Sequence, residues 1–240
     1  MARNPIRLIT FDLDNTLWPV TETIVRADAT MRRWLDAQVP GFSDQFQQEH
    51  FMALRQRLIA ADPALQHDLS KMRVAVLTAA LQTFGKTAAE AADTAASAFR
   101  IFIDGRHDVR YFEGVEQTLA ELARDYTLAA LTNGNADFGR LSIGKHMSFG
   151  FSSASVGVSK PHPDIFHAAL KHAGVAAHEA VHIGDHPMDD IHGAAAVGMR
   201  TILVRMEDLA TPEADAAAHA PDAQITALSE LAGVIAALEG

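Results

Sequence analysis

The pattern of hydrophobic and polar positions divides the chain into three parts. Residues 6–13 form a short apolar run that ends in acidic residues, which is typical of a buried strand whose carboxyl end carries function. The next comparable apolar run comes only after residue 126. Between these runs, apolar residues recur at helical spacing, as at Met31, Trp34 and Leu35. The first strand is therefore predicted to be separated from the rest of its sheet by a helical segment.

This helical segment is predicted to be an all-helical insert over residues 20–106. We expect four helices in it, near residues 22–39, 43–61, 67–84 and 88–103. Gly41 and Gly85 supply breaks, and Thr87 with Glu90 forms a capping box that opens the last helix.

The chain after residue 108 alternates between strand and helix patterns. Strands are expected at 127–132, 149–156, 181–184 and 201–204, and helices at 114–124, 137–145, 163–172 and 190–197. Two short helices are expected in the tail, one opened by Thr211 and Pro212 and one over 228–238. Such alternation implies right-handed crossovers and a parallel sheet. The prediction is an α/β fold, with a doubly wound, Rossmann-like core made of residues 1–19 and 107–240.

Composition excludes several classes of protein. The 240 residues are 48% hydrophobic, enough to bury a substantial core. The formal charge of −10 argues against a grip on nucleic acid or on an anionic membrane. Cysteine is absent, and no apolar run approaches the ~20 residues that span a bilayer. Asp12 and Asp14 also interrupt any apolar region of a signal peptide. We expect a cytoplasmic protein that binds neither nucleic acid nor membrane.

Polar residues collect where the predicted strands end. In chain order they are Asp12 and Asp14, then Thr132, Asn133 and Gly134, then Ser159, Lys160 and Pro161, then Gly184, Asp185, Asp189 and Asp190. Ligands of an open parallel sheet bind outside the carboxyl ends of its strands. Carboxylates that converge there repel one another unless a cation or protons compensate them. A hard, oxygen-preferring ion such as Mg²⁺ fits this set.

These four groups, in this order, resemble the four motifs of the haloacid-dehalogenase superfamily. The position of the helical insert resembles the first type of cap domain in that family. The resemblance implies that Asp12 is a nucleophile that forms an acyl-phosphate, and that Asp14 protonates the leaving group and then deprotonates water. It also implies that Mg²⁺ is held by the Asp12 and Asp185 carboxylates and the Asp14 backbone carbonyl.

The remaining motif residues have implied supporting roles. Thr132, through its hydroxyl, and Asn133, through its backbone N–H, would bind the transferring phosphoryl group, while Lys160 would supply a positive charge. Asp189 and Asp190 would fix water molecules of the metal. Each residue also has an ordinary interpretation: Asp189 suits a turn or helix cap, and Lys160 suits a solvated side chain before a helix.

Histidines recur every four residues at His178, His182 and His186, a spacing that on a helix would present a metal-binding face. Because residues 181–184 are predicted to be a strand, the three side chains would scatter. We expect surface or packing histidines, with His186 near the site entrance.

The substrate is expected to be a small phosphorylated metabolite, selected by the cap. His67, Lys71 and Arg73 cluster polar groups at the start of a predicted helix. The pair His67-Asp68 followed by Arg73, together with the segments 8–14 and 132–136, resembles the branch of the superfamily that includes bacterial phosphatases of flavin mononucleotide and of 5-amino-6-(5-phosphoribitylamino)uracil. The side chains of His67, Lys71 and Arg73 would then approach the ribityl or ring portion, although a solvated helix start is the competing interpretation.

Other functions stay open from sequence. Carbon–halogen cleavage needs neither the metal nor the second acid, and the presence of Asp14 and Asp185 disfavours it. A phosphomutase would return the phosphoryl group to substrate. A non-catalytic sensor of a phosphorylated metabolite predicts damaged catalytic positions, which the motifs do not show. The sequence does not indicate an oligomeric state.

Overall fold

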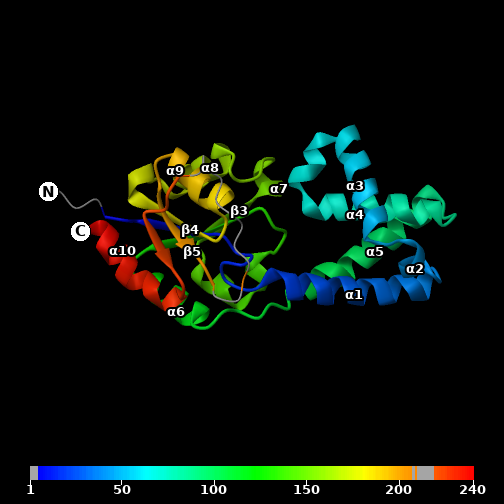
Figure 1. Ribbon diagram of the computed structural model, residues 1–240, viewed down its shortest axis with the longest axis horizontal. Helices are drawn as coiled ribbons and strands as arrows, with labels where there is room; N and C mark the ends of the chain where they lie inside the picture. Colours follow the sequence, from blue (N-terminus) through cyan, green and yellow to red (C-terminus); the bar gives the residue numbers. More distant parts are fainter. Residues whose placement is uncertain (1–4, 207–208, 210–218) are drawn as a thin grey trace. The chain divides into compact units, whose positions relative to one another are not determined.

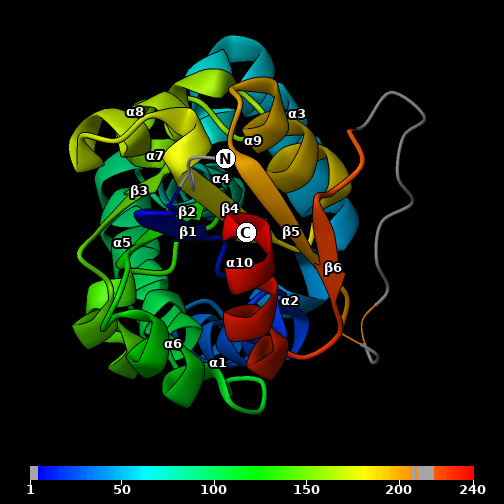
Figure 2. The ribbon, with the colours of Figure 1, turned by 90° about the vertical axis from the view of Figure 1, so that its left-hand side faces the viewer.

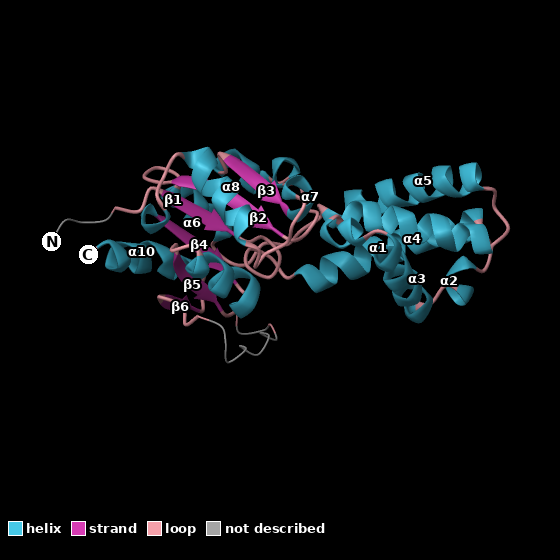
Figure 3. Ribbon diagram, turned by 90° about the horizontal axis from the view of Figure 1, so that it is seen from above, coloured by secondary structure: helices cyan, strands magenta, loops and turns pink. Residues whose placement is uncertain are grey.

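The structure, a computed structural model, describes residues 5–206, 209 and 219–240. It divides into two compact units. One combines the segments Met1–Pro19 and Arg110–Gly240, and the other is Val20–Val109. All strands labelled in Figure 3 lie in the first unit, and the second is built of helices joined by loops.

The first unit is built around a parallel sheet, whose strands are drawn as arrows in Figure 1. The sheet has six strands in the order β3-β2-β1-β4-β5-β6 (Figure 2). The strands are β1 (Leu8–Phe11), β2 (Thr127–Thr132), β3 (Phe149–Ser152), β4 (Ala180–Gly184), β5 (Arg200–Val204) and β6 (Ala223–Ile225). The chain builds outward from β1 through β2 and β3, and then through β4, β5 and β6 on the other side. The switch point of this doubly wound sheet lies between β1 and β4.

Helices cover both faces of the sheet. They include α6 (Val115–Leu122), α7 (Ser153–Val156), α8 (Pro163–Ala173), α9 (Gly193–Ala196) and α10 (Leu231–Glu239). Figure 2 shows α8 and α9 on one face, and α6 and α10 on the other. The central strands are fully buried, with Leu8, Ile9 and Phe11 at 0% exposure, so their apolar runs reflect burial on both faces.

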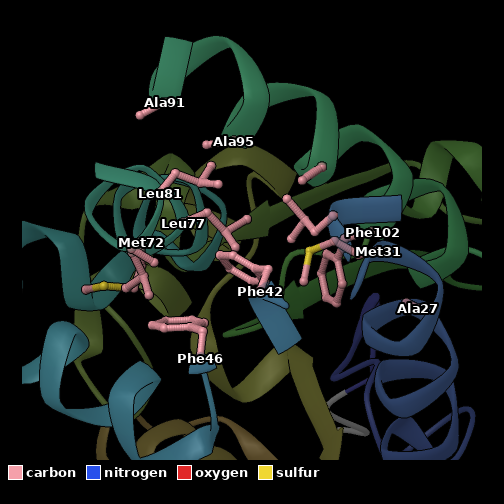
Figure 4. Packing of buried hydrophobic residues seen from close by; sticks show 14 residues of the cluster. Ala27, Met31, Phe42, Phe46, Met72, Leu77, Leu81, Ala91, Ala95 and Phe102 are labelled. Carbon is pink, nitrogen blue, oxygen red and sulfur yellow. The ribbon is translucent and has the colours of Figure 1, made fainter. Parts of the chain in front are cut away.

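The helical unit has a core of its own. Its helices are α1 (Val20–Gln38), α2 (Phe42–Gln45), α3 (Gln48–Ala61), α4 (Leu69–Thr83) and α5 (Ala88–Arg106), with the 3₁₀ helix η1 (Pro63–His67) before α4. Met31, Phe42 and Phe102 are among the buried side chains that meet in its interior (Figure 4). The predicted capping box opens α5, with the Thr87 hydroxyl accepting from the Glu90 backbone N–H.

The predicted fold class is confirmed, while several element boundaries differ from the prediction. The predicted helix at 43–61 is interrupted before Gln47, whose backbone is extended. The predicted strand at 149–156 stops at Ser152, because the Ser152 hydroxyl accepts from the Ser155 N–H and starts α7.

The predicted helix at 137–145 is two 3₁₀ helices, η2 (Phe138–Arg140) and η3 (Ser142–His146). Gly144 packs so closely on the Phe138 carbonyl that a side chain there would clash. The predicted helix at 190–197 begins earlier, as the π-helix η5 (Pro187–His192) that leads into α9.

The tail differs as well. The sequence pattern missed the edge strand β6, and the predicted helix at 228–238 starts as the 3₁₀ helix η6 (Leu228–Glu230). The helix predicted to open at Thr211 and Pro212 lies outside the described residues. Among the described residues, no helix has the length and apolar character to span a membrane.

Candidate active site

The carboxyl ends of the two central strands, β1 and β4, bring Asp12 and Asp185 together. Asp12 follows β1, and its backbone N–H donates to the carbonyl of Ile183 on β4 at 2.8 Å. Asp185 directly follows β4. The residues predicted as nucleophile and metal ligand therefore lie at the switch point, where open parallel sheets bind ligands.

Lys160 reaches the same place from the loop before α8. Its Nζ donates to Oδ1 of Asp12 at 2.7 Å, to Oδ1 of Asp190 at 2.5 Å and to the carbonyl of Leu131 at 2.8 Å. Burial by itself would lower the pKa of Lys160, but the two carboxylates raise it above its usual value. Lys160 is therefore a buried, charged ammonium rather than the solvated side chain of the ordinary interpretation.

Asp12 and Asp185 lie in a crowded, mostly buried acidic environment. Burial, with the charges of Asp190 and Asp185, raises the pKa of Asp12 well above its usual value, although Lys160 opposes this. Burial and the charge of Asp190 raise the pKa of Asp185 to about 7. The hydroxyl of Thr16 lies within reach of both, 3.3 Å from Oδ2 of Asp12 and 3.4 Å from Oδ1 of Asp185.

Asp190 is the most enclosed acid of the site. Its Oδ1 contacts Nζ of Lys160 and Nε2 of His182, and its Oδ2 accepts from the backbone N–H of His186 at 3.0 Å. Burial acts to raise the pKa of Asp190, but Lys160 and His182 lower it below its usual value. The Asp190 carboxyl group can occupy this position only because residue 184 has no side chain: a Cβ on Gly184 would lie 2.3 Å from Cγ of Asp190.

His182 was expected to be a surface or packing residue, and the structure places it inside the site. It is 0% exposed, with Nε2 3.0 Å from Oδ1 of Asp190 and Nδ1 2.8 Å from the Thr10 hydroxyl. The available signal was a titratable side chain within the otherwise apolar strand segment that contains Val181 and Ile183. Among the described residues, the side chains that lie close enough to hold a metal are three aspartates, and neither His178 nor His186 is one of them.

Asn133 positions the backbone of Lys160. Its Oδ1 accepts from the Lys160 N–H at 2.8 Å, and its Nδ2 donates to the Lys160 carbonyl at 3.0 Å and to Oδ2 of Asp189 at 3.3 Å. The hydroxyl of Thr132, which precedes it, accepts from the N–H of Gly134 at 2.8 Å. The two residues lie beside Lys160, and the predicted binding of phosphoryl oxygens by Thr132 and Asn133 stays a prediction.

Asp14 lies half-buried in a tight loop after β1. The N–H of Asn15 donates to the Trp18 carbonyl at 2.8 Å, and that of Leu17 donates to the Leu13 carbonyl at 2.9 Å. Asn15 takes a left-handed conformation with φ of 62°, which asparagine tolerates better than most residues. The loop backbone is thus well defined, and the proton-transfer role of Asp14 stays a prediction.

The three residues predicted to contact substrate from the helical unit have different surroundings. Arg73 is engaged inside the unit: its Nη1 is 3.0 Å from Oδ1 of Asp28, and its guanidinium lies 3.7 Å from the centroid of the Phe102 ring. Lys71 is exposed and pairs with Asp68. His67 ends η1 and is half-buried. Their contact with substrate stays a prediction.

The acidic residues fit a hard divalent cation. One carboxylate oxygen from each of Asp12, Asp185 and Asp190 lies within 4.8 Å of the others. The ammonium of Lys160 does not neutralise three carboxylates, and a divalent cation would supply the missing charge. Oxygen donors suit Mg²⁺. Asp190 is held by three donors, with Lys160 and His182 on Oδ1 and the His186 N–H on Oδ2, whereas each oxygen of Asp12 has one side-chain donor. Asp12 and Asp185 are therefore better placed as direct ligands.

A protein family and two relatives aligned over most of their length resemble this chain. The family described as haloacid dehalogenase-like hydrolase matches residues 6–198. The chain is 30% identical over 203 residues to 5-amino-6-(5-phospho-D-ribitylamino)uracil phosphatase YigB of Escherichia coli (strain K12), and the aligned region covers 85% of each chain. It is 31% identical over 211 residues to human haloacid dehalogenase-like hydrolase domain-containing protein 3, and this aligned region covers 84% of this chain and 83% of the relative.

Among solved structures, the chain is similar to the crystal structure of 2-haloacid dehalogenase from Pseudomonas syringae pv. Tomato DC3000. The TM-score is 0.91 and the sequence identity 42%, and the alignment covers 97% of this chain and 99% of the other.

Proposed function

The chain belongs to the haloacid dehalogenase-like hydrolase family, and on that premise we propose that it is a magnesium-dependent phosphatase that forms a phospho-aspartyl intermediate on Asp12. The observation that carries this proposal is the contact of a buried lysine with the nucleophile, 2.7 Å from Nζ of Lys160 to Oδ1 of Asp12, beside the Asp185 carboxylate. Such a site combines a carboxylate nucleophile with positive charge for an anionic phosphoryl group.

In the first step, a carboxylate oxygen of Asp12 attacks phosphorus and the bond from phosphorus to the ester oxygen breaks. Asp14 gives its proton to the departing alkoxide, which leaves as an alcohol. Lys160 and the hydroxyl of Thr132 stabilise charge on the phosphoryl oxygens.

In the second step, water attacks the phosphorus of the acyl-phosphate while Asp14, now a carboxylate, takes a proton from that water. The bond between phosphorus and the Asp12 oxygen breaks, inorganic phosphate leaves, and the starting state of both acids is restored. Hydrolysis is thus divided into two displacements at one phosphorus atom.

The carboxylates of Asp12 and Asp185, with the Asp14 backbone carbonyl, would hold Mg²⁺. When bound, the ion neutralises charge and orients the phosphoryl group. Asp190 and Asp189 would act outside the direct ligands: Asp190 holds Lys160, and Asp189 accepts from the Asn133 amide.

We propose flavin mononucleotide or 5-amino-6-(5-phosphoribitylamino)uracil as the substrate, selected by the helical unit acting as a cap. The similarity to the Escherichia coli phosphatase over most of both chains supports this choice. A place in riboflavin synthesis and a cytoplasmic location are parts of the same proposal.

A second candidate is the hydrolysis of a 2-haloacid, which the similarity to the Pseudomonas syringae dehalogenase favours. In that reaction the first aspartate attacks carbon, and neither a metal nor the second acid is needed. Hydrolysis of a 2-haloacid gives no role to Asp14 or Asp185, whereas phosphoryl transfer uses both. A phosphomutase would retain phosphate on its product, and a sensor would bind substrate without turnover.

The test is a substrate panel for the purified protein, with Mg²⁺ or with a chelator. The panel contains the two flavin-related phosphates, other sugar and nucleotide monophosphates, and 2-chloropropionate, and both free phosphate and free chloride are measured. We expect magnesium-dependent phosphate release with the highest kcat/KM for one of the flavin-related substrates. Asp12→Asn should remove this activity without unfolding the protein, while the exposed Asp164→Asn should retain it. Chloride release without Mg²⁺, or turnover by Asp12→Asn, would contradict the proposal.

A further inference from the structure

The fully buried His182 lies between two polar side chains on the central strands. On β4 it pairs in register with Thr10 of β1, and the Thr10 hydroxyl is 2.8 Å from its Nδ1. Its Nε2 is 3.0 Å from Oδ1 of Asp190. The same Asp190 oxygen accepts from Nζ of Lys160, which also contacts Asp12. A continuous chain of hydrogen bonds therefore runs from Thr10 to the nucleophile.

The contacts define which atoms carry protons. The pKa of Asp190 is below its usual value because Lys160 and His182 outweigh burial, so its carboxylate can only accept hydrogen bonds. Nε2 of His182 must then carry a hydrogen. Burial lowers the pKa of His182, so the ring is neutral at pH 7 and Nδ1 is an acceptor. The Thr10 hydroxyl, which also lies 3.4 Å from the Val181 carbonyl, donates to Nδ1 at the shorter distance of 2.8 Å.

This arrangement restricts the position of Asp190. Its Oδ2 is fixed by the backbone N–H of His186, and the bond from Nε2 of His182 fixes Oδ1 at the point where Nζ of Lys160 donates. Without His182, the carboxylate would lose one of the two donors that hold Oδ1. Of its two carboxylate partners, Lys160 would then keep only Asp12 in a defined position.

We propose that His182, held as its Nε2–H tautomer by Thr10, is a positioning residue that orients Asp190 and, through it, the Lys160 ammonium against Asp12. The proposal rests on the function proposed above for Asp12 and Lys160. It gives a reason for placing an imidazole inside a central strand, where burying a polar group without partners is costly.

The competing explanation is that His182 fills space. Its ring packs edge-to-face on Phe166, with 5.3 Å between the centroids. A space-filling role predicts that activity follows stability across substitutions, whichever nitrogen is replaced. A positioning role predicts that activity depends on the nitrogen that faces Asp190.

Two substitutions separate these roles. The amide nitrogen of His182→Gln lies near the position of Nε2 and can still donate to Asp190, whereas that of His182→Asn lies near Nδ1 and can reach only the Thr10 side. We expect His182→Gln to retain kcat within about threefold. His182→Asn should lose about 10- to 100-fold in kcat, the range for residues that orient an active-site ligand, with little change in KM. Melting temperatures are measured for both.

Thr10 on β1 and Thr201 on β5, the two strands that flank β4, give a test variant and a matched control. Thr10→Val removes the hydroxyl that donates to His182 and should lower kcat, while Thr10→Ser, which keeps a hydroxyl, should restore it. Thr201, in register with His182 on β5, bonds through its hydroxyl to Asp222 instead. Thr201→Val should therefore leave kcat unchanged.

The tautomer is measured independently of any activity, by ¹⁵N NMR of imidazole-labelled protein, with the His182 signal assigned by its loss in His182→Gln. The expected spectrum shows a neutral Nε2–H ring whose shifts change in Thr10→Val. A Nδ1–H ring, or equal losses of kcat in His182→Gln and His182→Asn at equal stability, would overturn the proposal. If the wild-type protein releases no phosphate, the proposed function fails, and the NMR result still tests the role of His182.

Discussion

Nζ of Lys160 lies 2.7 Å from Oδ1 of Asp12, although 148 residues separate them in sequence. Both side chains are almost fully buried, so the pair is held in an environment where charges interact more strongly than in water. The same ammonium contacts the Asp190 carboxylate, which makes one cation the partner of two acids. The carboxylate proposed as the nucleophile is therefore oriented by contacts within the protein.

Replacing Lys160 by Met should affect both stability and activity. The change leaves two buried carboxylates, those of Asp12 and Asp190, without their cation, and breaking a buried pair in this way costs about 3–5 kcal/mol. We expect this loss in denaturant unfolding at pH 7 and a smaller loss at pH 5, where the acids can bind protons. Phosphate release should fall to background. The exposed Lys71, which pairs with Asp68, is the matched control: Lys71→Met should cost at most about 1 kcal/mol.

Magnesium binding should weaken as the pH falls below about 7. Burial and Asp190 raise the pKa of Asp185 to about 7, so this carboxyl group is protonated below that pH in the metal-free protein. A metal ion must displace the proton, and the apparent Kd should then rise about tenfold for each pH unit below the pKa. Calorimetric titrations at pH 6, 7 and 8, in buffers of different ionisation enthalpy, measure both the Kd and the proton released. Binding that is independent of pH over this range would contradict this role for Asp185.

Gly184→Ala should disrupt the site from a buried backbone position at the end of β4. The added Cβ would lie 2.3 Å from Cγ of Asp190, and a buried carboxylate held by several hydrogen bonds cannot move without losing them. We expect lower stability and a large loss of kcat. Gly233→Ala is the control, because nothing lies within 4 Å of its added Cβ on α10, and alanine should stabilise that helix by up to about 1 kcal/mol. If Gly184→Ala behaves like Gly233→Ala, Asp190 is not fixed as described.

Arg73→Ala should chiefly lower stability. Its guanidinium pairs with Asp28 and stacks on Phe102, and a desolvated cation–π contact of this kind is worth about 2 kcal/mol. If Arg73 also contacts substrate, the variant should raise KM in addition to lowering the melting temperature. Lys71→Ala, two residues away and exposed, supplies the comparison: a change in KM there, without a change in stability, would support the predicted substrate surface.

The sequence was most informative where each residue was constrained by both burial and chemistry. The strand at 127–132 has the predicted bounds, because its apolar run at 128–131 lies between polar residues and has few alternatives. Asp12, Lys160 and Asp185 were predicted as neighbours because parallel strands bring their carboxyl ends to one edge, and the structure places them there.

Other features depend on contacts that a linear pattern does not contain. The strand β6 is short and partly exposed, so its residues carry little periodic signal. Strand β3 ends earlier than its apolar pattern indicates, because the Ser152 hydroxyl accepts a hydrogen bond from the Ser155 N–H and caps α7. For His182, the sequence pattern predicted only a surface or packing histidine, whereas its partners Thr10 and Asp190 come from β1 and the segment after β4.

The central position of β1 has a consequence for synthesis of the chain. Leu8 pairs in register with Thr127 and with Ala180, so the first strand has no neighbour until the ribosome has made residues far beyond the helical unit. The unit Val20–Val109 has its own buried cluster and is complete much sooner. Local contacts form faster than distant ones, and segments made first generally fold first. The helical unit should therefore fold before β1, the strand that precedes the proposed nucleophile Asp12, has strands to pair with, although β1 is synthesised first.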